Sequence, residues 1–126
     1  MEAILFPDAE GLLVTYLAGL LTEPVSTKVP DPRPATFVTI FRTGGGPNGL
    51  VTDNPLLAYE AWAATEIAAS NLAARVGAYL RAVDVVDGTQ FYGPVTVTGP
   101  INLPDPASGQ ARYTGFVSVG VRGTAI

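Results

Sequence analysis

Apolar residues recur every three or four positions in two stretches of the chain, which is the spacing of an amphipathic helix. In residues 8–22 the stripe consists of Leu12, Leu13, Tyr16, Leu17, Leu20 and Leu21. In residues 64–83 it consists of Ala64, Ala68, Leu72, Val76, Leu80 and Val83. Asp8 and Glu10 precede the first stripe, where the helix dipole favours negative charge, and Pro24 follows it. We therefore predict one helix in each stretch, with its apolar side packed on a sheet.

Five further stretches have the composition or the alternation of β-strands. They are residues 25–29, 35–42, a segment within 50–62, residues 95–98 and residues 112–122. The second is rich in β-branched and aromatic residues, and the last alternates apolar residues on one face. A break at Asn54-Pro55 would divide the third.

Prolines and glycines mark the connections between these elements. Residues 30–34 and 100–109 each hold three prolines, which lack an N–H donor, so we expect extended loops there and a further loop at 84–89. The run Gly44-Gly45-Gly46-Pro47-Asn48-Gly49 is expected to end the strand 35–42 and to form a flexible hairpin tip. The element order is then α-β-β-β-α-β-β. It predicts one α+β domain over residues 1–126, with two helices on one face of a curved, mostly antiparallel sheet.

The composition favours a folded subunit of an assembly. Of the 126 residues, 48% are hydrophobic and 14% are charged, where about 25% charged residues is usual. Disordered chains have the opposite balance. A surface so poor in charge suits a protein that covers part of itself with neighbours.

Several classes of function are excluded by what the sequence lacks. Without Cys or His it has no disulfide, thiolate zinc site, cysteine nucleophile or histidine-based triad. Its seven basic residues are scattered, so no basic run attracts nucleic acid. The longest apolar stretch, residues 12–21, is half of the roughly 20 residues that span a bilayer. The N-terminus lacks the cationic start of a secretory signal, so we expect an intracellular product without a membrane partner.

No motif in the chain points to catalysis. Gly44, Gly46 and Gly49 match the glycine spacing of a dinucleotide fingerprint, but no helix follows to bind the phosphates, and a hairpin tip is the better interpretation. The carboxylates show no pair that flanks a cleft. We therefore expect no catalytic, cofactor or metal site. Trp62, between a strand and the second helix, is expected to anchor the core.

Three arginines are the best candidates for contacts between subunits. Arg33, Arg42 and Arg112 lie beside loops or strand ends in a chain with few charges. We expect them at subunit or tail-tube contacts, paired with carboxylates such as Glu60 or Asp105 of a neighbour.

Three long stretches together resemble the tail terminator proteins of long-tailed bacteriophages, especially those of actinobacterial hosts. They read VPDPRPATFVTIFRTGGG, NPLLAYEAWAATEIAASNLAARVGAYL and GPINLPDPASGQARYTGFVSVGVRG. The family pattern falls on Pro32-Arg33-Pro34, Arg42-Thr43-Gly44-Gly45, Glu60-Ala61-Trp62, Leu103-Pro104-Asp105-Pro106 and Arg112-Tyr113. The similarity runs from about residue 5 to residue 122, and the order and spacing of these five motifs carry it.

The resemblance implies a virion structural protein without catalysis or cofactor. Such a protein forms a homohexameric ring on the completed tail tube in the phage neck, stops polymerisation of the major tail tube protein, and meets a head-completion or connector protein. Before that it would reside in the host cytoplasm. Genomic DNA would pass through without specific binding, so few cations should line the channel. We accordingly expect loops 43–49 and 84–89 nearer the lumen or the tube face.

Two alternatives to tail capping remain open from the sequence. A head-completion or connector protein of the neck would keep the setting and change the position. A small ligand-binding domain belongs to another class, and a large apolar pocket with converging polar groups would favour it.

Overall fold

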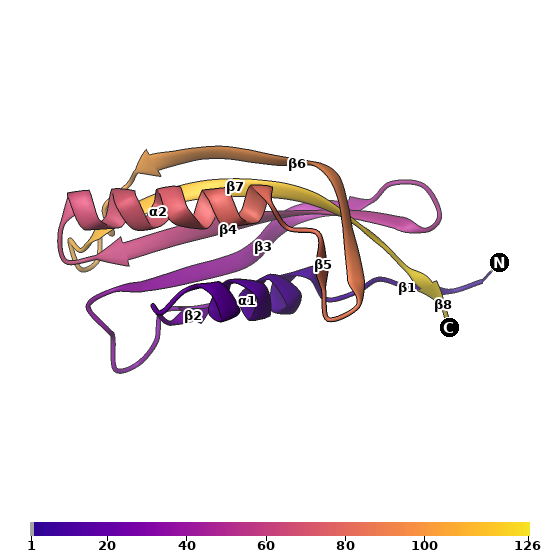
Figure 1. Cartoon of the computed structure of the whole chain (residues 1–126), viewed down its shortest axis with the longest axis horizontal. Coiled ribbons are helices and arrows are strands. Elements are labelled where there is room, and N and C mark those ends of the chain that lie inside the picture. Colours follow the sequence, from indigo (N-terminus) through magenta and orange to yellow (C-terminus); the bar gives the residue numbers. More distant parts are fainter. Residues whose placement is uncertain (1) are drawn as a thin grey trace.

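The computed structural model describes residues 2–126, apart from the side chain of Pro94 (Figure 1). Along the chain the elements are β1 (Ile4–Leu5), α1 (Ala9–Leu20), β2 (Val25–Ser26), β3 (Phe37–Pro47), β4 (Thr52–Ala63), α2 (Glu66–Arg81), β5 (Val85–Val86), β6 (Thr89–Asn102), β7 (Ala111–Arg122) and β8 (Thr124–Ala125). Neither helix in this part of the chain is long and apolar enough to cross a membrane.

One sheet of six strands forms the body of the protein, in the order β2-β3-β4-β7-β6-β5. The four long strands pair antiparallel, and only β2 runs parallel to its neighbour β3. Strands β1 and β8 form a separate two-stranded ribbon that brings the two chain ends side by side (Figure 1). The mostly antiparallel α+β architecture predicted from the sequence is confirmed.

The core lies between the two helices and one face of the sheet. Because side chains alternate along a strand, each long strand turns every second residue toward the helices. The helices contribute Leu13, Leu17, Leu72, Val76 and Leu80, and the strands contribute Val38, Ile40, Leu57, Tyr59, Ala61, Val117, Val119 and Val121. Figure 1 shows α2 running along β4 and β7, and α1 below β3. Both predicted helices are therefore confirmed, with both on the same face.

Side-chain caps set where the helices begin. The carboxylate of Asp8 accepts a hydrogen bond from the N–H of Gly11 (3.0 Å), and the hydroxyl of Thr65 accepts one from Ala68 (3.2 Å). Each bond satisfies one of the free N–H groups of a first helical turn. The helices are slightly shorter than predicted, because residue 8 is a cap and the capping Thr65 places the second helix start at Glu66.

Tyr59 shows how closely α2 approaches the sheet. Its side chain is fully buried, and its ring occupies the space that a Cβ at Gly115 would fill. Its hydroxyl lies against Gly77 of α2, where a Cβ would be only 3.0 Å away, and it has no hydrogen-bond partner among the described residues. Burial raises the pKa of this phenol above its usual value. Glycine at both positions lets a tyrosine, rather than a smaller residue, fill the layer between helix and sheet.

The prediction that the glycine run ends the strand 35–42 is wrong. Strand β3 continues to Pro47, with Gly44 opposite Leu56 and Gly46 opposite Asn54. A register shift after Arg42 makes this possible, and Gly45 adopts φ +79°, with its α-carbon against the backbone of Asn54. Only glycine tolerates this conformation next to another strand. The hairpin tip predicted at 44–49 is therefore confined to residues 48–51, and β4 is not divided at Asn54-Pro55.

Two of the expected loops are also shorter than predicted. Within 84–89 the chain forms strand β5, a tight turn with positive φ at Asp87 and Gly88, and the start of β6. Residues 100–102 belong to β6 rather than to the following loop. The predicted element order thus lacked β1, β5 and β8. These are two-residue strands, too short to show any alternation.

Both edges of the sheet are interrupted. On β6 the register shifts twice, between Tyr92 and Thr96 and again between Thr98 and Ile101. On β3 the N–H of Arg42 is occupied by the carboxylate of Glu10 from α1 (2.8 Å). Bulges and blocked donors of this kind hinder the addition of a further strand. Any contact with a partner is therefore better served by side chains than by strand pairing.

Candidate functional site

Trp62 lies at the end of the sheet where β4 meets α2, and it is 3% exposed. Its ring stacks on Phe37, with centroids 5.0 Å apart. The guanidinium carbons of Arg33 and Arg112 lie 5.4 and 5.1 Å from the ring centroid, within the range of cation–π attraction. Trp62 is buried, as predicted, but it lies outside the core between helices and sheet, because its neighbour Ala61 faces that core and side chains alternate along β4. Two of the three candidate arginines contact its ring.

The same two arginines tie two loops together. Arg33 donates to Ser108 Oγ and to Gln110 Oε1, both at 3.0 Å, and lies 3.7 Å from the carboxylate of Asp105. Arg112 Nε donates to the carbonyl of Leu103 (2.8 Å). Loop 30–36 and loop 103–110 are thus joined across the end of the sheet. We call Arg33, Trp62, Asp105 and Arg112 the arginine clamp.

Asp105 organises its own loop as well as facing the clamp arginines. It accepts hydrogen bonds from the Ser108 hydroxyl (2.6 Å) and the Ser108 N–H (3.1 Å). These bonds, the hydroxyl first among them, hold the pKa of the Asp105 carboxyl below its usual value, and the charge of Arg112 acts in the same direction. The ionised form of Asp105 therefore stabilises the loop.

Glu60 completes the polar contacts at this end of the sheet. The indole N–H of Trp62 donates to Thr39 Oγ1 (3.2 Å), and the Thr39 hydroxyl donates to Glu60 Oε1 (2.9 Å). Arg112 lies 3.4 Å from the other carboxylate oxygen of Glu60. One chain of contacts thus joins three neighbouring strands through Trp62, Thr39, Glu60 and Arg112.

Arg42 lies elsewhere, at the base of the β3–β4 hairpin. Its guanidinium binds both carboxylate oxygens of Asp53, at 2.8 and 3.0 Å, and its Nε donates to the carbonyl of Gly44 (2.9 Å). The side chain of Asp53 is only 3% exposed. Hydrogen bonding to Asp53 raises the pKa of Arg42. This ion pair fixes the register shift from which the hairpin extends.

The expected pairing of these residues between subunits needs correction. Arg33 and Arg112 do pair with the expected carboxylates, Glu60 and Asp105, but within one chain. For Arg42 the expected partners are wrong, because Asp53 binds it and neither Glu60 nor Asp105 does. Hairpin pairing explains the difference, since it puts Asp53 opposite Pro47 on the strand beside β3, where the long side chain of Arg42 reaches it. Arginine before a Gly-Pro turn and aspartate after it is the signal that could have revealed this pair.

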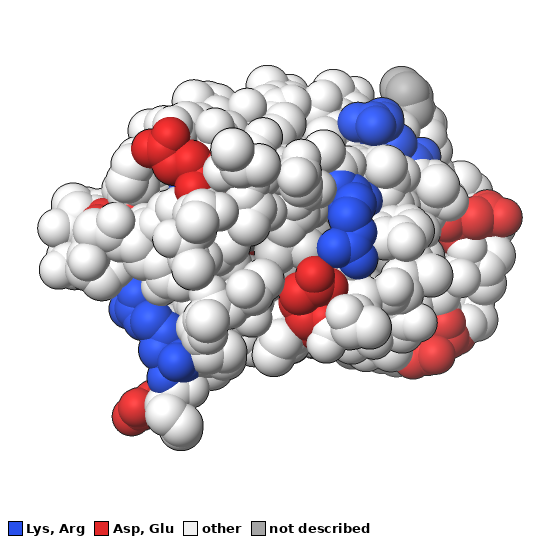
Figure 2. Space-filling view, turned by 60° about the vertical axis from the view of Figure 1, so that its left-hand side comes forward, with Lys and Arg blue, Asp and Glu red and all other residues white. Residues whose placement is uncertain are grey.

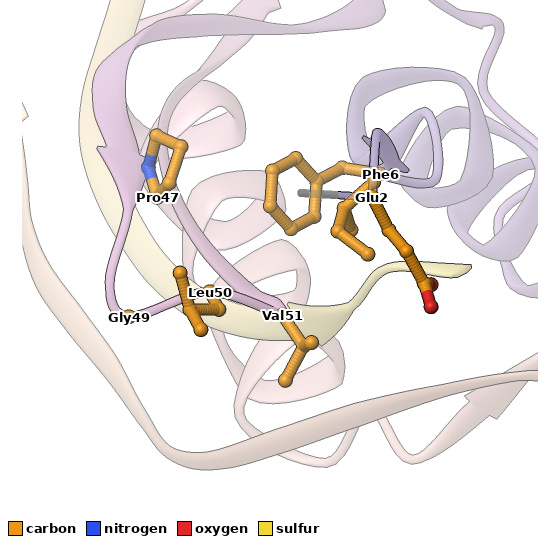
Figure 3. A pocket seen from close by; sticks show the side chains of 7 residues that line it. Glu2, Phe6, Pro47, Gly49, Leu50 and Val51 are labelled. Atoms are coloured by element: carbon orange, nitrogen blue, oxygen red, sulfur yellow. The ribbon is translucent and has the colours of Figure 1, made fainter. Parts of the chain in front are cut away.

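The opposite end of the sheet leaves apolar groups uncovered. The β3–β4 hairpin tip and the β1 segment enclose a cavity of about 540 Å³, lined by Glu2, Ile4, Phe6, Pro47, Gly49, Leu50 and Val51. In Figure 3, Phe6 lies on one side of this cavity and Pro47, Leu50 and Val51 on the other. Leu50 is 80% exposed. We call this cavity the socket.

A second exposed apolar group lies at the clamp end, at the start of α2. Ile67 is 77% exposed, more than any other large apolar side chain outside the socket and the chain ends. It lies beside a shallow polar hollow of about 220 Å³ that Glu66, Ser70, Asn71 and Tyr113 also line. Small neighbours on the helix leave Ile67 projecting from the surface.

The charges offer no obvious catalytic or metal centre. Among residues 2–126 no group of three or more potential metal-ligating side chains occurs. Figure 2 shows a mostly uncharged surface with a few scattered charged groups, some of them basic and acidic groups next to each other. The distinguishing features of this molecule are therefore its two contrasting ends.

Comparison with known proteins adds no family. No protein-family model matches the chain, and no curated protein does so. The function must therefore be inferred from the fold and from the two ends of its sheet.

Proposed function

We propose that this protein is a virion structural protein that caps the tail tube of a long-tailed bacteriophage. Six copies would form a ring in the neck, stop polymerisation of the major tail tube protein, and offer the surface that a head-completion or connector protein meets. Its residues act by shape and contact rather than by chemistry, with no catalytic group or cofactor. Genomic DNA would pass through the ring without specific binding.

The main support is the way the motifs of the sequence resemblance meet in space. Four of the five motifs, although distant from one another in the sequence, supply the arginine clamp and its partner Glu60. The fifth, beginning at Arg42, forms the bulge at the base of the hairpin. The residues that resemble the family pattern therefore make contacts that stabilise this fold. This is expected if the chain shares its architecture with that family.

The socket supports a subunit of an assembly. Ile4, Phe6, Leu50 and Val51 present apolar groups together at one end of the sheet, and isolated soluble proteins rarely leave large apolar patches uncovered. Both sheet edges are interrupted, so neighbours would meet through side chains. The expectation that loops 43–49 and 84–89 face the lumen or the tube remains part of this proposal.

The socket is the observation that favours the second candidate, a small ligand-binding domain. Its volume lies within the range of ligand pockets. However, among the described residues Glu2 is the one charged residue that lines it, and convergent polar groups are what orient a small molecule. An apolar side chain from a partner fits such a lining better.

Depletion is the decisive test of the proposed function. Phage tails assembled without this protein should exceed their normal length, because nothing ends the growth of the tube. Adding the purified protein back should restore the length, and negative-stain microscopy should show a ring at the head-proximal end. Tails of unchanged length would refute tail capping. A normal tail that fails to join heads would instead indicate a connector.

A further inference from the structure

We infer that copies of this chain associate head to tail, with Ile67 of one copy inserted into the socket of the next. The inference rests on the proposed function for the closure of six copies into a ring. The contact itself follows from the positions, exposure and charges of residues at the two ends of the sheet.

The socket has the properties of a receptor for one aliphatic side chain. Ile4, Phe6, Leu50 and Val51 present apolar groups to a space of about 540 Å³, which exceeds the volume of an isoleucine side chain and leaves room for neighbouring helix residues. Covering Leu50 and Ile67 together would remove two large apolar groups from water. Burying both groups favours association and acts against the entropy cost of joining two copies.

Ile67 has the properties of the matching knob. The residues three and four positions ahead on the same helical face are Ser70 and Asn71, which are too small to shield it. The helix neighbours of Ile67 therefore leave it exposed, although Tyr113 lies across the same hollow. Away from the socket and the chain ends, the next most exposed aliphatic side chain is Val85, which is 54% exposed and lies on a two-residue strand.

The charges around the two surfaces are complementary. Glu66 is exposed in the first turn of α2, and Arg122 is exposed opposite Thr52, one residue from the socket lining. Arg122 forms no ion pair with any residue that the structure describes. Glu2, on the socket itself, is acidic like Glu66, so docking must turn Glu66 toward Arg122 and away from Glu2. The complementary pair across the contact is therefore Glu66 with Arg122.

The two surfaces cannot meet within one molecule. Strand β4 lies between them and has 12 residues, roughly 35 Å at the usual rise per residue. Figure 1 shows the hairpin tip and the start of α2 at opposite ends of the sheet. A contact between different surfaces is heterologous, so repeated copies produce a closed ring or an open filament.

An intermolecular disulfide tests the contact directly, because the chain has no cysteine. The variant Leu50→Cys/Ile67→Cys, purified and mildly oxidised both alone and on tail tubes, should give reducible multimers on a denaturing gel. A disulfide requires α-carbons within about 7 Å, so any such bond joins two copies. The matched control Leu50→Cys/Leu20→Cys pairs the socket with another exposed aliphatic position, and it should remain monomeric.

Each outcome separates the contact from the proposed function. A ladder that stops at six links supports both the contact and the ring. A ladder that continues past six supports the contact and refutes the hexamer. If multimers are no more abundant than in the control, the contact is refuted. The proposed function is then tested separately by the tail lengths measured after depletion.

Discussion

The two ends of the sheet differ in how their side chains are used. At the clamp end, Arg33 and Arg112 contact Trp62, the Asp105 carboxylate and loop atoms of the same chain. At the socket end, Leu50 is 80% exposed and no ion pair reaches the cavity lining of the described chain. The clamp side chains are engaged in contacts within the chain, whereas the apolar side chains that line the socket are left uncovered.

This difference shows that a chain with few charges can use them mainly for its own loops. An arginine already held by a ring and two or three acceptors is a poor choice for a partner contact, because a partner must first replace those bonds. An exposed leucine or isoleucine gains from any contact that excludes water. The clamp should therefore govern stability, whereas Leu50 and Ile67 should govern association.

The largest effect is expected for Trp62→Ala. This substitution removes a buried ring that stacks on Phe37 and faces two guanidinium groups. It should lower the free energy of unfolding by about 3–5 kcal/mol, measured by urea denaturation. Trp62→Phe should lose much less, because it keeps a ring for both arginines. Equal losses for the two variants would mean that the indole N–H bond to Thr39 dominates.

Arg42→Ala should follow, with a loss of about 3 kcal/mol. The reason is that a carboxylate 3% exposed, Asp53, would lose its partner while remaining buried. Charge reversal at Arg42 should lower the free energy of unfolding further, because it would place a second negative charge beside the buried Asp53 carboxylate. Such a variant is therefore unsuitable for testing tail capping by a folded monomer. Arg75→Ala, which breaks the exposed pair with Glu23, should cost less than about 1 kcal/mol by thermal unfolding. Similar losses for both would show that burial of Asp53 has little influence.

Acid should weaken the clamp through Asp105. In the folded chain the pKa of this carboxyl is lowered from 3.8, so its contribution to stability is complete above about pH 4. That contribution is lost as the pH falls through the lowered folded pKa. The difference in Tm between the native chain and Asp105→Asn should therefore shrink from neutral pH toward about pH 2. Ser108→Ala, which removes the main hydrogen bond, should show a weaker dependence on pH.

The smallest effect on stability is expected at the open surfaces. Leu50→Ser and Ile67→Ser change exposed side chains and should shift the free energy of unfolding by no more than about 0.5 kcal/mol. Association should nevertheless be lost in both, measured by analytical ultracentrifugation or by ring formation on tail tubes. Leu20→Ser is the matched control and should leave association intact. A large loss of stability at Leu50 would show that the hairpin tip supports the fold.

Local patterns were enough to predict the main elements. The helical spacing from Leu12 to Leu21 and from Ala68 to Leu80 located both helices, because an amphipathic segment buries one of its faces. Three residues of the predicted stripes, Leu20, Ala64 and Ala68, are nevertheless exposed. The alternation in 112–122 located β7 for the same reason. Turn residues located the hairpin but not its length, since a bulge lets Gly44–Gly46 remain paired.

The partners of the candidate residues depended on the tertiary structure. The sequence could identify Arg33, Arg42, Arg112, Glu60 and Asp105 as notable charges in a chain poor in charge. Which of them meet is decided by strand order and register, which place Trp62 opposite Arg112 and Glu60 opposite Thr39. The pairing of Arg42 with Asp53 likewise required the bulge. The exposure of Leu50 and Ile67 also depended on the tertiary structure. Whether an apolar residue is buried is decided only when the whole chain packs around it.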